Sequence, residues 1–167
     1  AKTDNVLVLE HDWKLIEDMQ TTYNRLKSGI ELLNSDVDCV RYRHRHQPGH
    51  PQFSFKYKDR ELDYYDKEID AKSPHLLDSL HWLNPDEKFG DKIWKSGEYF
   101  VTYSKWANFT NNPCLYTKQF YIDNVGTFIG DGIELEGKIS KWWNRQEFKV
   151  AHGEGLFKHI DEGKYVK

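Results

Sequence analysis

Cysteine is scarce in this sequence of 167 residues, and long apolar runs are missing. The two cysteines, Cys39 and Cys114, stand far apart and form no CxxC pair, so we expect a reducing compartment and no disulfide framework. No stretch approaches the roughly 20 apolar residues that a membrane-spanning helix needs. No signal-peptide pattern is visible either. We therefore expect a cytoplasmic protein without a transmembrane segment.

A strong charge of one sign is also missing, because the formal net charge is only −3. Nothing in this balance predicts a general attraction to nucleic acid or to anionic membrane. The length suits a single domain over residues 1–167. Only 38% of the residues are hydrophobic, yet 15% are aromatic. Aromatic side chains fill core volume, and they also present flat faces on which sugars or bases stack.

The stretch around which the chain is organised is Asn5–Trp13. Four apolar residues, Val6 to Leu9, are followed at once by Glu10 and Asp12. A short apolar run of this kind is typical of a strand buried in an α/β sheet, where ligands bind beyond the carboxyl ends of the strands. The i, i+2 spacing lets both carboxylates face one ion, and Mg²⁺ and Mn²⁺ prefer oxygen ligands. The same spacing also occurs in solvated loops.

Periodicity predicts a strand, a helix and a second strand in the first 43 residues. Apolar residues recur at helical spacing from about Lys14 to Leu33, and Val37–Arg43 alternates as a strand does. This order implies a parallel crossover. Further strands are predicted at 99–103 and from Phe148 up to a Gly-rich turn at 153–155, and helices at 117–124 and 133–143. We expect an α/β fold whose mixed, mostly parallel sheet is flanked by helices.

Two regions offer groups for binding. Arg41 belongs to the most basic run of the chain and suits phosphates or an acidic acceptor, although such a run also protects an exposed strand edge. Trp106, Asn111 and Asn112 offer a ring for apolar sugar faces and amides for hydroxyl groups. The alternative for Asn111-Asn112-Pro113 is an ordinary turn.

Glu136 falls on a largely apolar face of the helix predicted at 133–143. An acid in such a place pairs with a cation, has a raised pKa or takes part in chemistry. Glu134 and Asp131 lie close to it in the sequence. For each of these acids the alternative is a solvated residue of a helix.

Five pieces of the sequence, in this order and spacing, resemble GT-A glycosyltransferases, which use nucleotide-sugar donors and have small members in bacteria and in large viruses of algae. Leu9–Trp13 resembles their LEDDW-like form of the DxD motif, with Glu10 in place of the first Asp and His11 between the acids. The other pieces are Val40–Tyr42, Asn112–Tyr116, the Glu136 helix and Gly155–His159.

The resemblance implies a GT-A-like, Rossmann-related fold and a hexosyl or deoxyhexosyl transferase, of which this chain would be the carboxyl-terminal portion without the nucleotide-binding part. It implies that Glu10, Asp12 and His159 hold Mn²⁺ or Mg²⁺ against the donor diphosphate, with a UDP-sugar favoured.

The resemblance also implies a catalytic base at Glu136, Glu134 or Asp131 that activates a glycan or glycoprotein hydroxyl. The reaction would proceed with inversion, or with retention if no acid is poised there. The donor- and acceptor-binding residues would be Glu10, His11, Asp12, Trp13, Arg41, Trp106, Asn111 and Asn112. The location would be the host cytoplasm if the protein is viral.

Two other classes of function stay open. A non-catalytic carbohydrate-binding module would use tryptophan and asparagine to hold sugar, with the acids on a structural Ca²⁺; such modules are usually all-β. A metal-dependent phosphoryl-transfer enzyme or nucleotide-sugar hydrolase would also use clustered carboxylates. It would cleave a nucleotide sugar and show no preference for an added acceptor.

Overall fold

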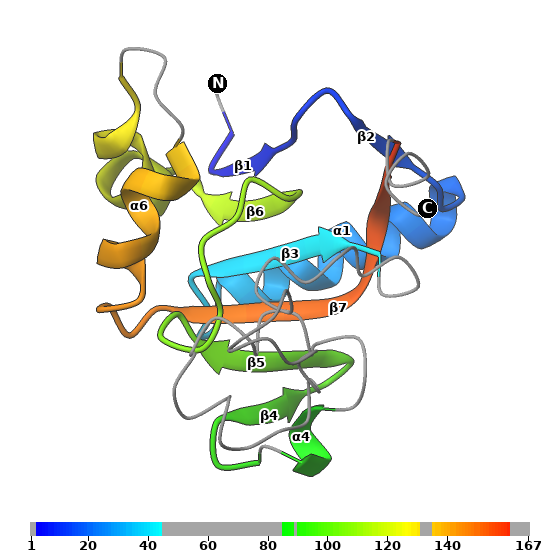
Figure 1. Cartoon of the computed structure of the whole chain (residues 1–167). Coiled ribbons are helices and arrows are strands. Elements are labelled where there is room, and N and C mark those ends of the chain that lie inside the picture. The colour runs from blue at the N-terminus through cyan, green and yellow to red at the C-terminus, as the bar shows by residue number, and fades with distance from the viewer. Residues whose placement is uncertain (1–2, 45–84, 89, 131–134, 161–167) are drawn as a thin grey trace, which may run out of the picture.

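The computed structural model describes residues 3–44, 85–88, 90–130 and 135–160. Seven strands form one sheet, drawn in Figure 1. The strands are β1 (Asn5–Val8), β2 (Trp13–Leu15), β3 (Cys39–Arg43), β4 (Ile93–Ser96), β5 (Tyr99–Tyr103), β6 (Cys114–Thr117) and β7 (Lys149–His159). The helical segments are α1 (Met19–Leu33), α4 (Pro85–Lys88), α5 (Lys118–Phe120), the π-helix η1 (Tyr121–Val125), the 3₁₀ turn η2 (Gly126–Phe128) and α6 (Leu135–Trp143).

The sheet is mixed, as predicted, but it is mostly antiparallel. Its order is β1-β6-β3-β7-β5-β4, and β2 pairs with β7 beside this path. Of the six strand pairings in the described residues, only β3–β7 is parallel. The expectation of a mostly parallel sheet is therefore wrong for this part of the chain. The apolar run Val6–Leu9 was expected to be a buried strand, but β1 lies at the edge of the described sheet, is only partly buried, and is followed by the exposed Leu9. An apolar run also carries no information about the direction of the neighbouring strand.

The predicted strand–helix–strand unit exists with one strand inserted into it. Both β1 and β3 are antiparallel to β6, so they run in the same direction. β6 comes from a distant part of the sequence and lies between them. The direction of the crossover was predictable from the local pattern, whereas the neighbour of β1 was not.

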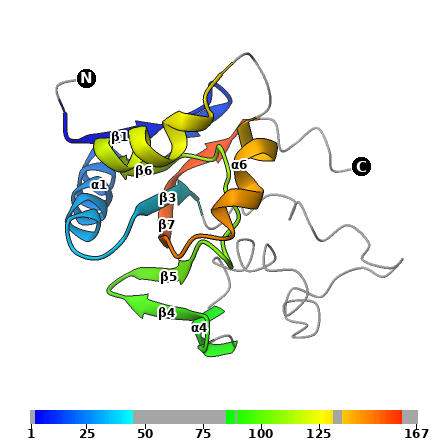
Figure 2. The same ribbon diagram turned by 90° about the vertical axis from the view of Figure 1, so that its left-hand side faces the viewer.

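Helices cover both faces of the sheet (Figure 2). Each face has its own core of buried side chains. α1 packs Leu33, with the partly buried Leu26 and Ile30, against one face, in contact with Val40 and Tyr42 of β3. α6 packs Ile139 and Trp143 against the other face. Successive side chains of a strand point to opposite faces, and β3 and β6 accordingly supply residues to both cores.

Helix α1 begins five residues later than the periodicity predicted. Trp13–Leu15 is the short strand β2, which pairs with the end of β7. Asp18 then caps the helix, since its carboxylate accepts a hydrogen bond of 2.8 Å from the backbone N–H of Thr21. An acidic N-cap of this kind is a common helix start. The apolar residues Leu15 and Ile16 fit a helical period by coincidence, and both are exposed.

The Gly-rich segment near the end of the chain is part of β7 and not a separate turn. β7 runs unbroken over eleven residues, with an irregularity in its pairing to β3 between Arg41 and Arg43. Gly155 has a φ of +80°, and a Cβ atom there would lie 2.1 Å from the carbonyl oxygen of Arg43. Glycine is needed here to let the strand continue through a bulge.

The remaining predicted elements are present. The strand at 99–103 is β5, and the helix predicted at 117–124 consists of α5 and η1. α6 covers Leu135–Trp143, while 131–134 lie outside the described residues. None of the helices in the described ranges has the length and the apolar character to cross a membrane.

The close approach of α1 to β3 depends on Gly29. A Cβ atom at Gly29 would lie 2.0 Å from the hydroxyl oxygen of Tyr42, whose side chain is buried and donates a 2.9 Å hydrogen bond to the carbonyl oxygen of Arg25. We therefore expect Gly29→Ala to lower the free energy of unfolding by about 1 to 3 kcal/mol through overpacking. Alanine's better helix propensity, about 1 kcal/mol, offsets this only in part.

Urea denaturation checks this expectation. Adding Tyr42→Phe to Gly29→Ala removes the clashing hydroxyl, so the double variant should lose less than the sum of the single variants. Lys27→Ala, at an exposed position of the same helix, should change stability by no more than about 0.5 kcal/mol. A Gly29→Ala variant as stable as the wild type would show that α1 does not pack on Tyr42 as described.

Candidate functional site

Asn111 joins two acids that come from opposite ends of the chain. Glu10 follows β1, and Glu136 lies in the first turn of α6. The backbone N–H of Asn111 donates a 2.6 Å hydrogen bond to Oε1 of Glu136. The side chain of Asn111 lies near the Glu10 carboxylate, where its hydrogen-bonding acts to lower the pKa of that group. Three of the residues predicted for the site thus meet at one place beside the end of β1.

The carboxylate of Glu10 lies in an unfavourable electrostatic position. Partial burial raises its pKa above the usual value, and the negative charges of Asp12 and Glu136 raise it further. The hydrogen bond from Asn111 and the neighbouring His11 act in the opposite direction without cancelling the shift. Carboxylates close enough to disturb each other are stabilised by a cation between them.

Asp12 and His159 are also neighbours, although 147 positions separate them. Nε2 of His159 donates a 2.9 Å hydrogen bond to Oδ2 of Asp12. The two strands are paired here, with Trp13 opposite His159 and the N–H of Ile160 donating to the carbonyl oxygen of Asp12 at 2.7 Å. The Trp13 ring packs edge-on against the imidazole, with ring centres 5.1 Å apart. β2 and β7 together therefore hold the acid and the histidine side by side.

The donor set fits a hard divalent cation in its chemistry. Oδ1 of Asp12 is buried and has no hydrogen-bond partner in the described residues. In the same ranges, no three His, Cys, Asp or Glu side chains already stand as a metal site. A cation at this place would therefore replace the hydrogen bond between Asp12 and His159. Carboxylate oxygens and a neutral imidazole are ligands that Mn²⁺ accepts.

The side chain of Arg41, for which a phosphate-binding role was predicted, is buried. Its side chain is 4% exposed, and it donates a hydrogen bond to the carbonyl oxygen of Asn108. This contact ties β3 to the loop before β6, and it is structural. Arg43, two residues further along the same strand, places its guanidinium 5.3 Å from the centre of the Trp13 ring. Burial lowers the pKa of Arg43 to about 10, which still leaves it charged at neutral pH.

The other predicted binding residues lie in different surroundings. Lys92 and Lys105 place their Nζ atoms 4.5 and 4.8 Å from the centre of the Trp106 ring. The N–H of Asn112 donates to Oγ1 of Thr110 at 3.1 Å, which is a local turn contact. His11 is exposed next to the acids. Glu134 and Asp131 lie outside the described residues.

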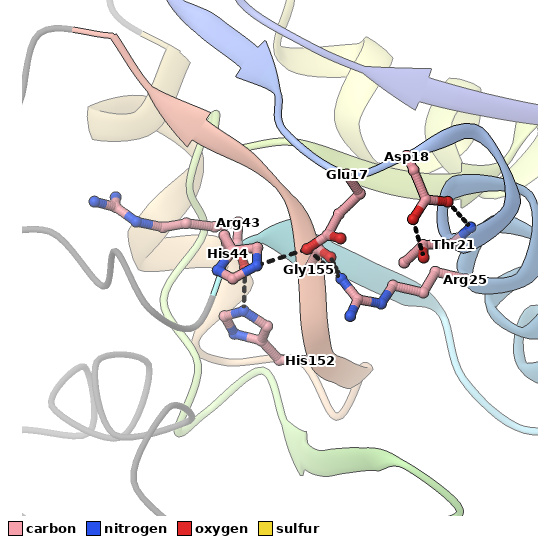
Figure 3. Close-up of polar contacts among 8 residues, drawn as sticks. All are labelled: Glu17, Asp18, Thr21, Arg25, Arg43, His44, His152 and Gly155. Carbon is pink, nitrogen blue, oxygen red and sulfur yellow. Dashed lines mark hydrogen bonds and ion pairs between the residues drawn. The ribbon is translucent and has the colours of Figure 1, made fainter.

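A second polar cluster, which the sequence reasoning missed, is centred on Glu17 (Figure 3). Oε1 of Glu17 accepts hydrogen bonds from Nε2 of His44 at 2.8 Å and from Nη1 of Arg25 at 3.0 Å. The hydrogen bond from His44 is the largest cause of a lowered pKa at Glu17, and Arg25 adds to it. The sequence around Glu17 was interpreted as part of a helix and gave no signal for this cluster. The reason is that the partners of Glu17, Arg25 and His44, lie 8 and 27 positions away.

Comparison with known proteins finds no family, no curated protein and no solved structure that matches this chain. The function is therefore argued from the residues and their geometry.

The lowered pKa of Glu17 has a consequence for stability. Ionised Glu17 is favoured in the folded state, so its contribution is fully present above its unfolded pKa, near 4.5, and is lost as the pH falls through the lower folded value. We expect Glu17→Gln to lose about 1.5 to 3 kcal/mol at pH 6. Its difference from the wild type should shrink as the pH falls from about 4.5 towards 3.

Urea denaturation at several pH values measures this difference. Glu31→Gln is the matched control, because Glu31 is 66% exposed and its pair with Lys27 is long, at 3.9 Å. That variant should stay close to the wild type at every pH. Equal losses in the two variants would be inconsistent with a special role for Glu17.

Proposed function

We propose that this chain is part of a metal-dependent glycosyltransferase that moves a sugar from a nucleoside-diphosphate sugar to a hydroxyl group of a glycan or glycoprotein. The observation that carries the proposal is the meeting of Glu10, Asn111 and Glu136. Asp12, two residues after Glu10, is hydrogen-bonded to His159. These residues come from separate pieces of the sequence that resemble GT-A glycosyltransferases. Their convergence supports that resemblance independently of the spacing.

Glu10, Asp12 and His159 are the residues that would hold Mn²⁺ or Mg²⁺. When bound, such a cation offsets the charge of the donor diphosphate and stabilises the nucleoside-diphosphate leaving group. The raised pKa of Glu10 and the buried Oδ1 of Asp12 are both features that a cation would relieve. A UDP-sugar is the donor we favour.

Glu136 is the proposed general base. Its Oε1 atom is held by the N–H of Asn111, which fixes the direction of the carboxylate. The second oxygen, Oε2, would accept the proton of the acceptor hydroxyl group. The hydroxyl oxygen of the acceptor would attack the anomeric carbon at the same time. Attack by the acceptor from the side opposite the leaving group gives inversion at that carbon.

Arg43 replaces Arg41 as the proposed contact to the diphosphate. Its guanidinium is desolvated and lies over Trp13, which itself packs on His159. A charged, partly buried guanidinium binds phosphate oxygens strongly. Cys39 and Cys114 are buried free thiols, which suits the cytoplasm as the proposed location.

Calorimetry tests the donor site. The wild type should bind one class among UDP-, GDP- and dTDP-sugars in the presence of Mn²⁺, and Asp12→Asn should weaken that binding at least about 10-fold. Asp123→Asn, an exposed acid that pairs only with Gln119 in the described residues, is the control and should bind as the wild type does. Binding that is equally strong without metal would contradict a metal-dependent donor site.

Transfer from a radiolabelled donor tests the base. Glu136→Gln keeps an oxygen for the Asn111 N–H but cannot accept a proton, so kcat should fall by about 10² to 10⁴ while donor affinity stays unchanged. Glu147→Gln, at an exposed position, should leave kcat as it is. Donor cleavage that an added acceptor does not accelerate would identify a hydrolase instead.

A further inference from the structure

The bulge of β7 changes the partners of that strand. Before it, β3 and β7 pair from Cys39 opposite Val150 to Arg41 opposite His152. Pairing resumes with Arg43 opposite Phe157, so the four residues 153–156 of β7 correspond to the single residue Tyr42 of β3. On the other edge of β7, β5 is the neighbour up to His152, and β2 is the neighbour from Phe157 onward.

The carboxylate of Glu17 and its two hydrogen-bond partners link the surrounding elements to this bulge, as Figure 3 shows. Glu17, between β2 and α1, accepts from Arg25 of α1 and from His44 at the end of β3. Nη1 of Arg25 also donates a 2.5 Å hydrogen bond to the carbonyl oxygen of Gly155. The side chains of Glu17, Arg25 and His44 are only 21%, 22% and 8% exposed. We call these three residues the Glu17 latch.

The segment 156–160, made of the last four residues of β7 and Ile160, leads out of the bulge and ends at the candidate site. The carbonyl oxygens of Leu156 and Phe157 accept hydrogen bonds from the N–H groups of Ile16 and His44, at 3.1 and 2.8 Å. At the far end, the N–H of Ile160 donates to the carbonyl oxygen of Asp12, beside the contact of His159 with that residue's carboxylate. The place where β7 leaves the bulge thus determines where His159 meets Asp12.

Backbone pairing alone is a weak means of holding this segment. β2 has only three residues, and Lys14 and Leu15 are exposed. Short strands at the edge of a sheet are only marginally stable. The latch adds shielded, charge-assisted hydrogen bonds, which are about twice as strong as neutral ones.

From these contacts we infer that the Glu17 latch sets the position of segment 156–160, and with it the position of His159 relative to Asp12. Glu17, Arg25 and His44 are then positioning residues, since none of them touches the acids of the site in the described contacts. The expected effect on cation binding rests on the function proposed above. The stabilisation of segment 156–160 by the Glu17 latch does not depend on that function. Residues behind a metal site that orient its ligands typically change metal affinity 10- to 100-fold when they are replaced.

The test combines amide hydrogen exchange with Mn²⁺ binding in Arg25→Gln. The N–H of Ile160 should exchange at least about 10-fold faster than in the wild type, because segment 156–160 is less firmly held against Asp12. The N–H of Asp38, which donates to the carbonyl oxygen of Lys149 at the other end of β7, should be unaffected. The Kd for Mn²⁺, measured by calorimetry, should rise at least about 10-fold.

Lys27→Gln is the matched control, because it removes an exposed cation from the same helix and should change neither measurement. Arg25→Lys keeps the charge and should restore part of the protection of Ile160, and it serves if Arg25→Gln does not fold. Unchanged exchange at Ile160, or equal acceleration at Ile160 and Asp38, would overturn the latch. Selective acceleration at Ile160 in a protein that binds no Mn²⁺ would support the latch and overturn the proposed metal site.

Discussion

The parallel pairing of β3 with β7 is the constraint on which the rest of the structure depends. β7 is the longest strand of the described sheet and contacts β3, β5 and β2 in turn. Both cores are built on this pair, with Val40 and Ala151 on the side of α1 and Cys39 and Val150 on the side of α6. The bulge at Gly155 then redirects β7 from β5 to β2. Without that change of neighbour, His159 would not meet Asp12.

The pKa values of two acids, Glu10 and Glu17, are shifted in opposite directions. Glu17 lies between an arginine and a histidine, and its pKa is lowered. Glu10 is partly buried and lies beside two other acids, and its pKa is raised. An acid whose charge the protein itself compensates holds the fold together. An acid whose charge is left uncompensated beside other acids is where a bound cation gains the most. The two clusters therefore have different tasks, although one strand, β7, connects them.

The residues that meet at the site were largely predictable, because they occur in motifs whose order was visible in the sequence. The sequence alone makes Glu10, Asp12, Asn111, Glu136 and His159 candidates. The burial of Arg41 was not predictable, since alternation along β3 does not tell which of two residues on one face is covered by the loop of Asn108. The Glu17 latch was not predictable, because its contacts join a helix start, a strand end and a bulge.

The sequence by itself determined many of the strands and helices, because apolar periodicity and capping are local properties, but not the short strand β2, which replaces the start of a predicted helix. It also determined which groups are available for chemistry. Only the tertiary structure decided the direction of strand pairing, the insertion of β6 between β1 and β3, and the pairing of Asp12 with His159. These features depend on contacts between residues up to 147 positions apart. Local patterns are compatible with several such arrangements, and packing on both faces of the sheet selects one of them.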